Sequence, residues 1–238
     1  LQERGYDARL ACAPDGAAFD AALAPFRPLR LHFPRSPRPL AMAHACRQLL
    51  AILRHIRPDV LHLHTPAAAL PVRMVPRWAM PAGTRVVYTV HGFAHVWDAR
   101  GWQNRALERV ERALAPRTDL LLFQSQEDLD QTRVHGYRTD LCYLGNGVEE
   151  SWFAIPPRPR PARPMRLLFV GRLIREKGVL DLFDALAAVP DARLTVAGAA
   201  LPTDRDGVES ELRERAASPA LRLQRISRLF FRSTSRTT

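Results

Sequence analysis

Short apolar runs alternate with segments of helical periodicity along most of the chain, and this alternation is the feature that most constrains the fold. Apolar runs predict strands at residues 7–12, 60–63, 85–90, 119–123 and 141–144. Apolar spacings of three and four residues predict helices between them, at residues 44–57, 105–114 and from about 126. Strands that alternate with helices favour a parallel sheet with helices on both faces. Ligands bind such sheets beyond the carboxyl ends of the strands, so the polar residues that end each strand are the functional candidates.

A proline-rich segment divides the chain into two domains. Residues 155–164 read IPPRPRPARP, and proline supplies no backbone donor to a helix or sheet, so a stiff linker is predicted there. The pattern restarts after it, with strands at 165–170 and 194–197 and helices to about 188 and at 208–217. From residue 222 the periodicity ends. We therefore expect an N-terminal domain over 1–154, a second domain over 165–221 that is too short to bury its sheet, and an unrelated tail over 222–238.

The composition is that of a globular protein with a basic excess. Of the 238 residues, 47% are hydrophobic and 25% are charged, which excludes a disordered or collagen-like chain. The net charge of +11 is carried by 34 arginines and one lysine. A basic chain can bind nucleic acid or an anionic membrane. No basic patch is interleaved with aromatic residues, so a solvated arginine surface is favoured over nucleic-acid binding. A non-enzymatic nucleic-acid-binding protein remains the alternative function.

The sequence carries few signs of export, membrane insertion or metal binding. Cys12, Cys46 and Cys142 lie far apart and form no CxxC pair, which disfavours zinc and disulfides and favours a reducing cytoplasm. No apolar run approaches the ~18 residues of a spanning helix, and no signal peptide is visible. The first residue is Leu rather than Met, which suggests that the chain begins inside a longer protein.

Three cations lie close together after the strand at 165–170. Gly171 ends that strand, and Arg172, Arg175 and Lys177 lie at the start of a predicted helix. Cations at the start of a helix oppose its macrodipole, and a bound anion would resolve that conflict. An anion site at Gly171, Arg172 and Lys177 is therefore favoured over three solvated cations balanced in part by Glu176. The Lys-Gly order is not that of a P-loop, and the absence of a G-x-G-x-x-G motif disfavours dinucleotide binding.

Histidines mark the ends of two predicted strands. His91 follows the strand at 85–90 and precedes Gly92, which predicts that it faces the ligand edge, although a lone histidine is more often structural. His62 and His64 alternate with leucines. His62 is predicted on a packed face, whereas His64 and Thr65 end their strand and can line the same cleft. No acidic cluster lies nearby, so no metal site is expected.

Four segments occur in a recognisable order, reading DVLHLHT from Asp59, TVHGF from Thr89, GNGVE from Gly145 and FVGRLIREKG from Phe169. Together they resemble the family 4 glycosyltransferases of the GT-B fold, especially the capsule and exopolysaccharide type, over roughly residues 1–221. The resemblance implies an α/β protein of two Rossmann-like domains, the second of them truncated. The C-terminal domain would hold a nucleotide-sugar, and the N-terminal domain would present the acceptor.

The resemblance also implies roles for single residues. Arg172 and Lys177 match the pair that grips the donor diphosphate, with Gly171 beside them, and His91 matches the active-site histidine that touches the donor sugar. Transfer in this family is retaining and metal-independent, with no cofactor besides the donor. The implied partners are a nucleotide-sugar and a saccharide or lipid-linked saccharide acceptor in cell-surface polysaccharide synthesis, without nucleic acid.

Two departures from the family pattern bear on activity. The family's first strand and glycine-rich turn would lie before residue 1, and its pair of glutamates that binds the donor ribose and sugar would lie beyond residue 221. We therefore expect the chain purified alone to transfer sugar poorly or not at all.

Two further interpretations concern a membrane and a metal ion. The helix at 44–57 carries Arg47, Arg54 and Arg57 beside an apolar stripe, so it is either a core helix or a peripheral contact with the inner face of the cytoplasmic membrane. Asp204 and Asp206 form the D-x-D tripeptide that binds a metal ion in the other glycosyltransferase fold. Capping of the following helix is the favoured role for these aspartates.

Overall fold

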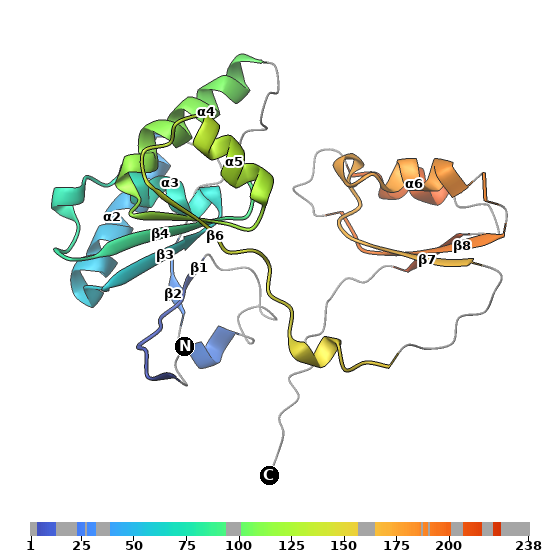
Figure 1. The fold of residues 1–238 in the computed structure, drawn as a ribbon, viewed down its shortest axis with the longest axis horizontal. Helices are drawn as coiled ribbons and strands as arrows, with labels where there is room; N and C mark the ends of the chain where they lie inside the picture. The colour runs from blue at the N-terminus through green and yellow to red at the C-terminus, as the bar shows by residue number, and fades with distance from the viewer. Residues whose placement is uncertain are drawn as a thin grey trace, which may run out of the picture. The chain divides into compact units, whose positions relative to one another are not determined.

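The computed structural model describes residues 4–12, 23–26, 28–31, 39–93, 101–156, 165–186, 188–189, 191–200, 207–215 and 221–224. The chain divides into two compact units, Leu1–Glu149 and Glu150–Thr238, close to residue 154 where the sequence suggests the first domain to end. Both units are α/β (Figure 1). Most of the proline-rich segment, residues 157–164, lies outside the described residues, as does the tail from residue 225.

The first unit is built on a parallel sheet of four strands in sequential order. These strands are β3 (Val60–His64), β4 (Arg85–Val90), β5 (Leu120–Phe123) and β6 (Asp140–Tyr143). Helix α2 (Pro39–Ile56) precedes the sheet, and α3 (Pro66–Met74), α4 (Trp102–Leu114) and α5 (Gln126–Val134) connect successive strands. Short segments complete the unit: β1 (Ala11–Cys12), β2 (Leu29–Arg30), η2 (Ala24–Phe26), η3 (Arg77–Ala79) and η4 (Ala115–Arg117). Strands β1 and β2 pair with each other in parallel.

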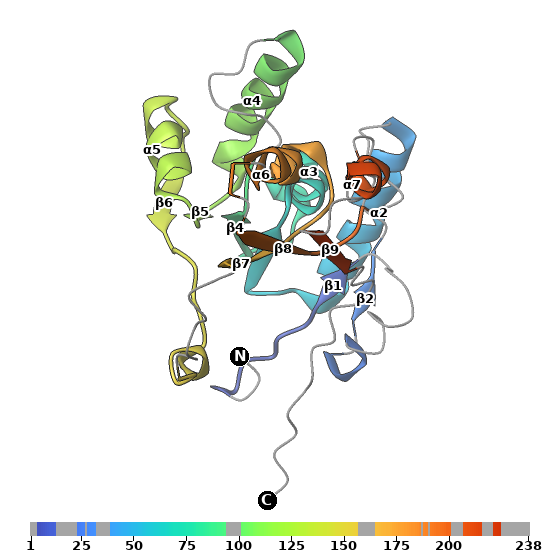
Figure 2. The same cartoon turned by 90° about the vertical axis from the view of Figure 1, so that its right-hand side faces the viewer.

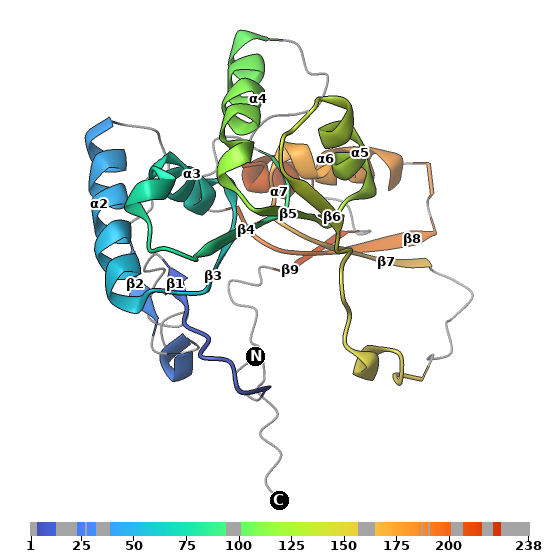
Figure 3. The same cartoon turned by 60° about the vertical axis from the view of Figure 1, so that its left-hand side comes forward.

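The connecting helices α3, α4 and α5 lie on one face of the four-stranded sheet (Figure 3). The expectation of helices on both faces is therefore not met by the described helices that connect these strands. The reason is topological: each strand is added on the same side of the previous one, and right-handed crossovers then place every connecting helix on the same face. Side chains that point to the other face remain exposed or half-buried at Val60, Leu120 and Leu122.

The core of the first unit lies between the sheet and its helices. Residues from alternate positions of β3, β4 and β5 pack against α2, α3 and α5. Along β4 these are Val86, Tyr88 and Val90, all almost fully buried. Helix α5 begins after Ser125, whose hydroxyl accepts a hydrogen bond from the backbone N–H of Asp128 at 3.3 Å and caps the first turn.

Helix α2 turns its apolar stripe inward. The buried residues of this stripe are Met42, Ala45, Leu49 and Leu53. Of the two interpretations of the stripe, a core helix or a membrane contact, this burial favours the core helix. Within the described residues, no helix combines the length and hydropathy needed to cross a membrane.

The second unit is a smaller α/β layer of one parallel sheet and two described helices. Parallel strands β7 (Met165–Val170), β8 (Ala192–Ala197) and β9 (Leu221–Gln224) pair in that order. Helices α6 (Val179–Leu186) and α7 (Glu209–Arg215) lie on one face of this sheet (Figure 2). Its remaining elements are the short turns η5 (Glu150–Trp152) and η6 (Arg175–Lys177). Strand β9 continues to Gln224, so regular structure extends past residue 221, where the sequence pattern ends.

One face of the second sheet is open. Leu168 and Val170 alternate with the inward-facing Leu167 and Phe169, and each is 66% exposed. The strand pattern therefore predicts more burial than this part of the chain provides, as its small size led us to expect.

A candidate active site at the carboxyl ends of the strands

Three histidines meet at the carboxyl ends of β3 and β4. The Nδ1 of His64 lies 2.9 Å from the Nε2 of His91, and the Nδ1 of His91 lies 2.7 Å from the Oε1 of Gln124. One residue pair further down the strands, the Nε2 of His62 lies 2.7 Å from the Oγ1 of Thr89. The rings of His62 and His64 are 4.3 Å apart between centroids. These contacts form a continuous polar row across β3, β4 and β5 at the edge where α/β sheets bind ligands.

The contact with Gln124 bears on which ring nitrogen of His91 carries its proton. With the amide oxygen of Gln124 as acceptor, the Nδ1–H of His91 donates to it. The Nε2 of neutral His91 is then a lone-pair acceptor, to which the Nδ1–H of His64 donates. The row thus holds His91 in one tautomer, with an acceptor nitrogen at the sheet edge.

The two histidines of β3 resist protonation. Partial burial, followed by the nearby His91, lowers the pKa of His62 below its ordinary value of 6.5. Burial likewise lowers the pKa of His64, with further contributions from His62 and His91. Like charges so close together oppose one another, so both imidazoles are neutral at physiological pH.

The backbone is strained immediately after His64. Thr65 adopts φ 75 and ψ 144, a region that β-branched residues rarely occupy. It precedes α3, whose first residue is Pro66. Strained residues of this kind concentrate at functional sites.

The structure corrects the prediction for His62. It was expected on a packed face, but its side chain is exposed and shares its face with His64. Residues two apart on a strand point to the same side of the sheet. Leu61 and Leu63 point to the opposite side from His62, and it is that side that packs into the core.

The GNGVE segment follows β6 at the same edge. The backbone N–H groups of Leu144 and Gly145 both donate to the carbonyl of Phe123, at 2.8 and 3.2 Å. Gly145 takes a left-handed φ of 70, which glycine supplies without cost. The segment therefore turns sharply where β5 and β6 end.

In the second unit, two glycines meet where β7 and β8 end. The N–H of Gly171 donates to the carbonyl of Ala197 at 3.1 Å. A Cβ on Gly198 would overlap the carbonyl oxygen of Gly171, so only glycine fits at this position. The close approach fixes the loop that carries Arg172.

The predicted anion-binding cations lie in this loop, with one change from expectation. Arg172 and Lys177 are both exposed. Lys177 belongs to the separate 3-10 turn η6, which ends at Gly178 with a left-handed φ of 68, and α6 begins only after it. The cations therefore precede the helix rather than lying in its first turn, which carries Asp181. Arg175 is engaged elsewhere, because its guanidinium forms an ion pair with Glu211 of α7 at 2.9 Å.

Sequence reasoning missed three residues of these sites. Gln124 and Thr89 complete the histidine row, and Gly198 shapes the loop after β7. Gln124 follows its strand directly, as His91 does, which is a signal that could have found it. Asp204 and Asp206 lie outside the described residues. In the part of the chain that the structure describes, no three His, Cys, Asp or Glu side chains gather in a way that could hold a metal ion.

The fold of the two units is that of the GT-B glycosyltransferases. The chain resembles a sucrose-phosphate synthase from Thermosynechococcus elongatus with a TM-score of 0.61 and 16% identity, over 83% of this chain and 54% of that one. It resembles an alpha,alpha-trehalose 6-phosphate synthase from Burkholderia multivorans with a TM-score of 0.53 and 15% identity, over 78% and 50% of the two chains.

Residues 1–147 match the family described as glycosyl transferase 4-like domain, and the chain belongs to this family. It is 32% identical over 186 residues to a glycogen synthase of Mycobacterium tuberculosis, covering 72% of this chain and 43% of that protein. It is 30% identical over 184 residues to the glycosyltransferase EpsD of Bacillus subtilis, covering 69% and 47% of the two proteins. The chain thus spans less than half the length of these relatives.

Proposed function

We propose that this chain takes part in the transfer of a sugar from a nucleotide-sugar to a saccharide or lipid-linked saccharide acceptor. The observation that carries the proposal is the row His64–His91–Gln124. It lies at the carboxyl ends of the strands in a domain that belongs to the glycosyl transferase 4-like family. The names of the relatives, a glycogen synthase and a glycosyltransferase, support hexosyl transfer as the reaction class.

His91 is proposed to contact the donor sugar. The row gives its Nε2 the lone pair of a neutral imidazole, which accepts a hydrogen bond from a sugar hydroxyl. His64 occupies that nitrogen in the structure, so a sugar hydroxyl would replace the Nδ1–H of His64 as donor. Gln124 is proposed as the positioning residue that keeps His91 in this tautomer, and His64 as the group that occupies the Nε2 of His91 until the donor binds.

Arg172 and Lys177, on the loop fixed by Gly171, are proposed to hold the donor diphosphate. In the reaction the bond from the anomeric carbon to the phosphate oxygen breaks, and both electrons stay on the diphosphate. The acceptor oxygen bonds to the anomeric carbon, and its proton passes to the departing diphosphate oxygen. Cations beside the leaving diphosphate stabilise the charge that grows during this step.

We further propose that transfer retains the anomeric configuration, needs no metal ion and serves cell-surface polysaccharide synthesis in the cytoplasm. The support is the family of residues 1–147 and the relatedness to EpsD and to a protein of the cps region of Klebsiella pneumoniae. Proton NMR of the product reports its configuration, and activity in excess EDTA reports metal dependence.

The binding test uses isothermal calorimetry of the full chain with UDP-glucose, UDP-N-acetylglucosamine and GDP-mannose. Replacing Arg172 and Lys177 with alanine is expected to weaken donor binding by about tenfold or more for each lost charge-assisted contact. The matched control removes Arg166 and Arg193, exposed cations on β7 and β8. Equal binding of a nucleotide-sugar by the two variants would contradict the anion site.

The second test addresses the histidine row through donor hydrolysis and transfer. The unaltered chain is expected to turn over slowly, and His91→Ala is expected to lower that residual turnover by roughly a hundredfold, the usual effect of losing one group that acts in the transition state. His55→Ala, an exposed histidine on α2, is the control and should leave turnover unchanged. Unchanged turnover in His91→Ala would remove His91 from the reaction.

A further inference from the structure

A basic cavity of about 460 Å³ lies in the first unit, away from the histidine row. One wall is the C-terminal half of α4 with Pro116 of η4, and the other is the turn from His135 to Arg138 between α5 and β6. Since η4 leads into β5 and Arg138 leads into β6, the cavity lies at the amino ends of these strands. His91 lies at the carboxyl ends, so the cavity is at the opposite edge of the sheet.

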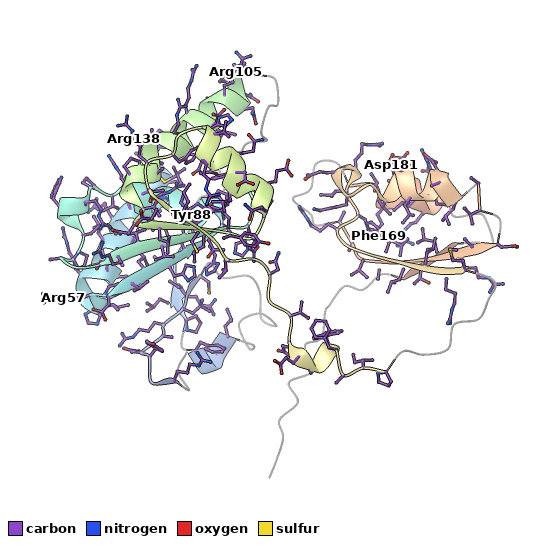
Figure 4. All side chains as sticks on the ribbon, in the orientation of Figure 1. Arg57, Tyr88, Arg105, Arg138, Phe169 and Asp181 are labelled. Atoms are coloured by element: carbon purple, nitrogen blue, oxygen red, sulfur yellow. The ribbon has the colours of Figure 1, made fainter. Side chains whose placement is uncertain are left out.

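Arginines dominate the walls of this cavity. Arg109 and Arg112 come from α4, and Arg138 comes from the turn before β6. Arg105 precedes Arg109 by one turn and extends the row along the same side of α4. Figure 4 shows Arg105 and Arg138 on the side of the sheet that the helices cover. All four are exposed, and none forms an ion pair or a side-chain hydrogen bond within the described ranges.

The acidic residues of α4 do not neutralise this row. Glu108, which could pair with Arg112 one turn away, has its Oε1 2.7 Å from the Nδ1 of His135 instead. Glu111 is buried and pairs with Arg73 on α3. The helix C-terminus offers partial negative charge to Arg112, but it gives no reason for three arginines to line one cavity.

We infer that this cavity binds a phosphate group. Guanidinium groups present planar pairs of donors that match the oxygens of phosphate, and the three arginines that line this cavity carry more donors than a carboxylate can accept. The volume is many times the ~30 Å³ of a water molecule, so a phosphate ester fits with its substituent. The site shares no residue with the proposed donor site and does not depend on the proposed function.

Two sources present the same phosphate chemistry, a soluble phosphate ester and the headgroup of an anionic lipid. The surface of α4 beside the arginines is apolar, with Trp102 77%, Val110 46% and Leu107 43% exposed. Amphipathic helices with arginines beside tryptophan and aliphatic side chains lie at membrane surfaces. Inorganic phosphate and glycerol 3-phosphate serve as soluble probes, and vesicles of phosphatidylcholine with and without phosphatidylglycerol serve as lipid probes.

The test compares the unaltered full chain with Arg109→Gln, Arg112→Gln and Arg138→Gln combined. The matched control replaces Arg47, Arg54 and Arg57, three exposed cations on and just after α2, by glutamine. We expect the cavity variant to lose at least about tenfold in affinity, in calorimetry with the soluble esters or in sedimentation with anionic vesicles. The control should retain binding. Hydrogen exchange of β4 must be equal in both variants, which separates lost binding from lost folding.

The two arms identify the source and can overturn the inference. Selective loss with the soluble esters assigns a soluble ligand. Selective loss with anionic vesicles alone assigns a lipid headgroup, and the additional variant Trp102→Ala should then weaken sedimentation as well. Equal losses in the cavity variant and its control, or no binding to any probe, overturn the site. None of these results depends on donor binding or sugar transfer.

Discussion

A buried ion pair joins α3 to α4, and its removal should reveal a large and non-additive effect on stability. The Nη2 of Arg73 lies 2.7 Å from the Oε2 of Glu111, and the two residues are only 1% and 6% exposed. The Nε–H of Arg73 donates to the carbonyl of Ala69 at 3.3 Å, and its guanidinium lies 5.0 Å from the ring centre of Tyr88. Figure 4 shows Tyr88 on the central strands of the sheet. Water therefore screens this pair very little.

The cost of breaking such a pair follows from the charge left behind. Arg73→Met would leave the carboxylate of Glu111 buried without a cation, and Glu111→Leu would leave the guanidinium without an anion. Each change is expected to cost about 3–5 kcal/mol, because the remaining charge loses its partner but stays away from water. The double variant removes both charges and keeps the volume, so it should range from neutral to about 4 kcal/mol more stable.

Hydrogen exchange of the β4 segment, residues 85–90, reports the unfolding free energy of this unit alone, which a single thermal transition of a two-unit chain does not. A loss of 3 kcal/mol corresponds to roughly 150-fold lower protection. The control pair is Arg133 with Asp130, 57% and 58% exposed, whose removal should cost less than about 1 kcal/mol. The coupling of the buried pair would be refuted if Arg73→Met and Glu111→Leu each cost less than about 1 kcal/mol, or if the double variant cost the sum of the two.

Three further predictions concern the two sites. Because the folded-state pKa values of His62 and His64 lie below the ordinary 6.5, the unfolded chain binds more protons below that pH. The contribution of His62 and His64 to the free energy of unfolding is therefore constant above about pH 6.5 and decreases as the pH is lowered below that value. Hydrogen exchange measured at pH values above and below 6.5 tests this. Gly198→Ala should destabilise the second unit by about 1–3 kcal/mol, seen in exchange of β8, because its Cβ meets the Gly171 carbonyl. Thr65→Gly should stabilise the first unit by about 1 kcal/mol, seen in hydrogen exchange of β4, by relieving a φ of 75.

Each of these has a distinct control. Replacing both His62 and His64 with glutamine should flatten the acid limb, whereas replacing the exposed His55 should not. Gly147→Ala adds a Cβ in open space at an ordinary φ, so it should cost little where Gly198→Ala costs much. If Thr65→Gly destabilised the unit, the φ at this position would not be a source of strain.

The sheet could be predicted from the sequence because its signals are local. Residues 85–90 and 165–170 are the strands β4 and β7, with the bounds that the apolar runs indicated. Short apolar runs between helical segments leave few alternatives to parallel pairing with crossover helices. The family motifs then placed the candidate residues at the ends of those strands.

The histidine row required information that no local pattern contains. Its partners are set by register: Val90 pairs with Phe123, so the next residues along, His91 and Gln124, come together. The offset between two parallel strands depends on how the apolar patterns of both strands pack against the rest of the sheet, so neither strand's sequence alone specifies it. Sequence reasoning found the histidine at the strand end but not the amide that fixes its tautomer.

Helix α4 shows most clearly where periodicity fails. Its aliphatic residues Leu107 and Val110 are 43% and 46% exposed, while Glu111 is 6% exposed. Periodicity identifies an apolar stripe, but it contains no information about Arg73, which lies 38 residues before Glu111 in the chain and is buried on the neighbouring helix α3. Turning the stripe inward would expose Glu111 and leave Arg73 buried without an anion, which costs more than burying two half-exposed aliphatic side chains gains. The ion pair therefore sets the orientation of α4, and the same orientation brings Arg109 and Arg112 to the cavity wall.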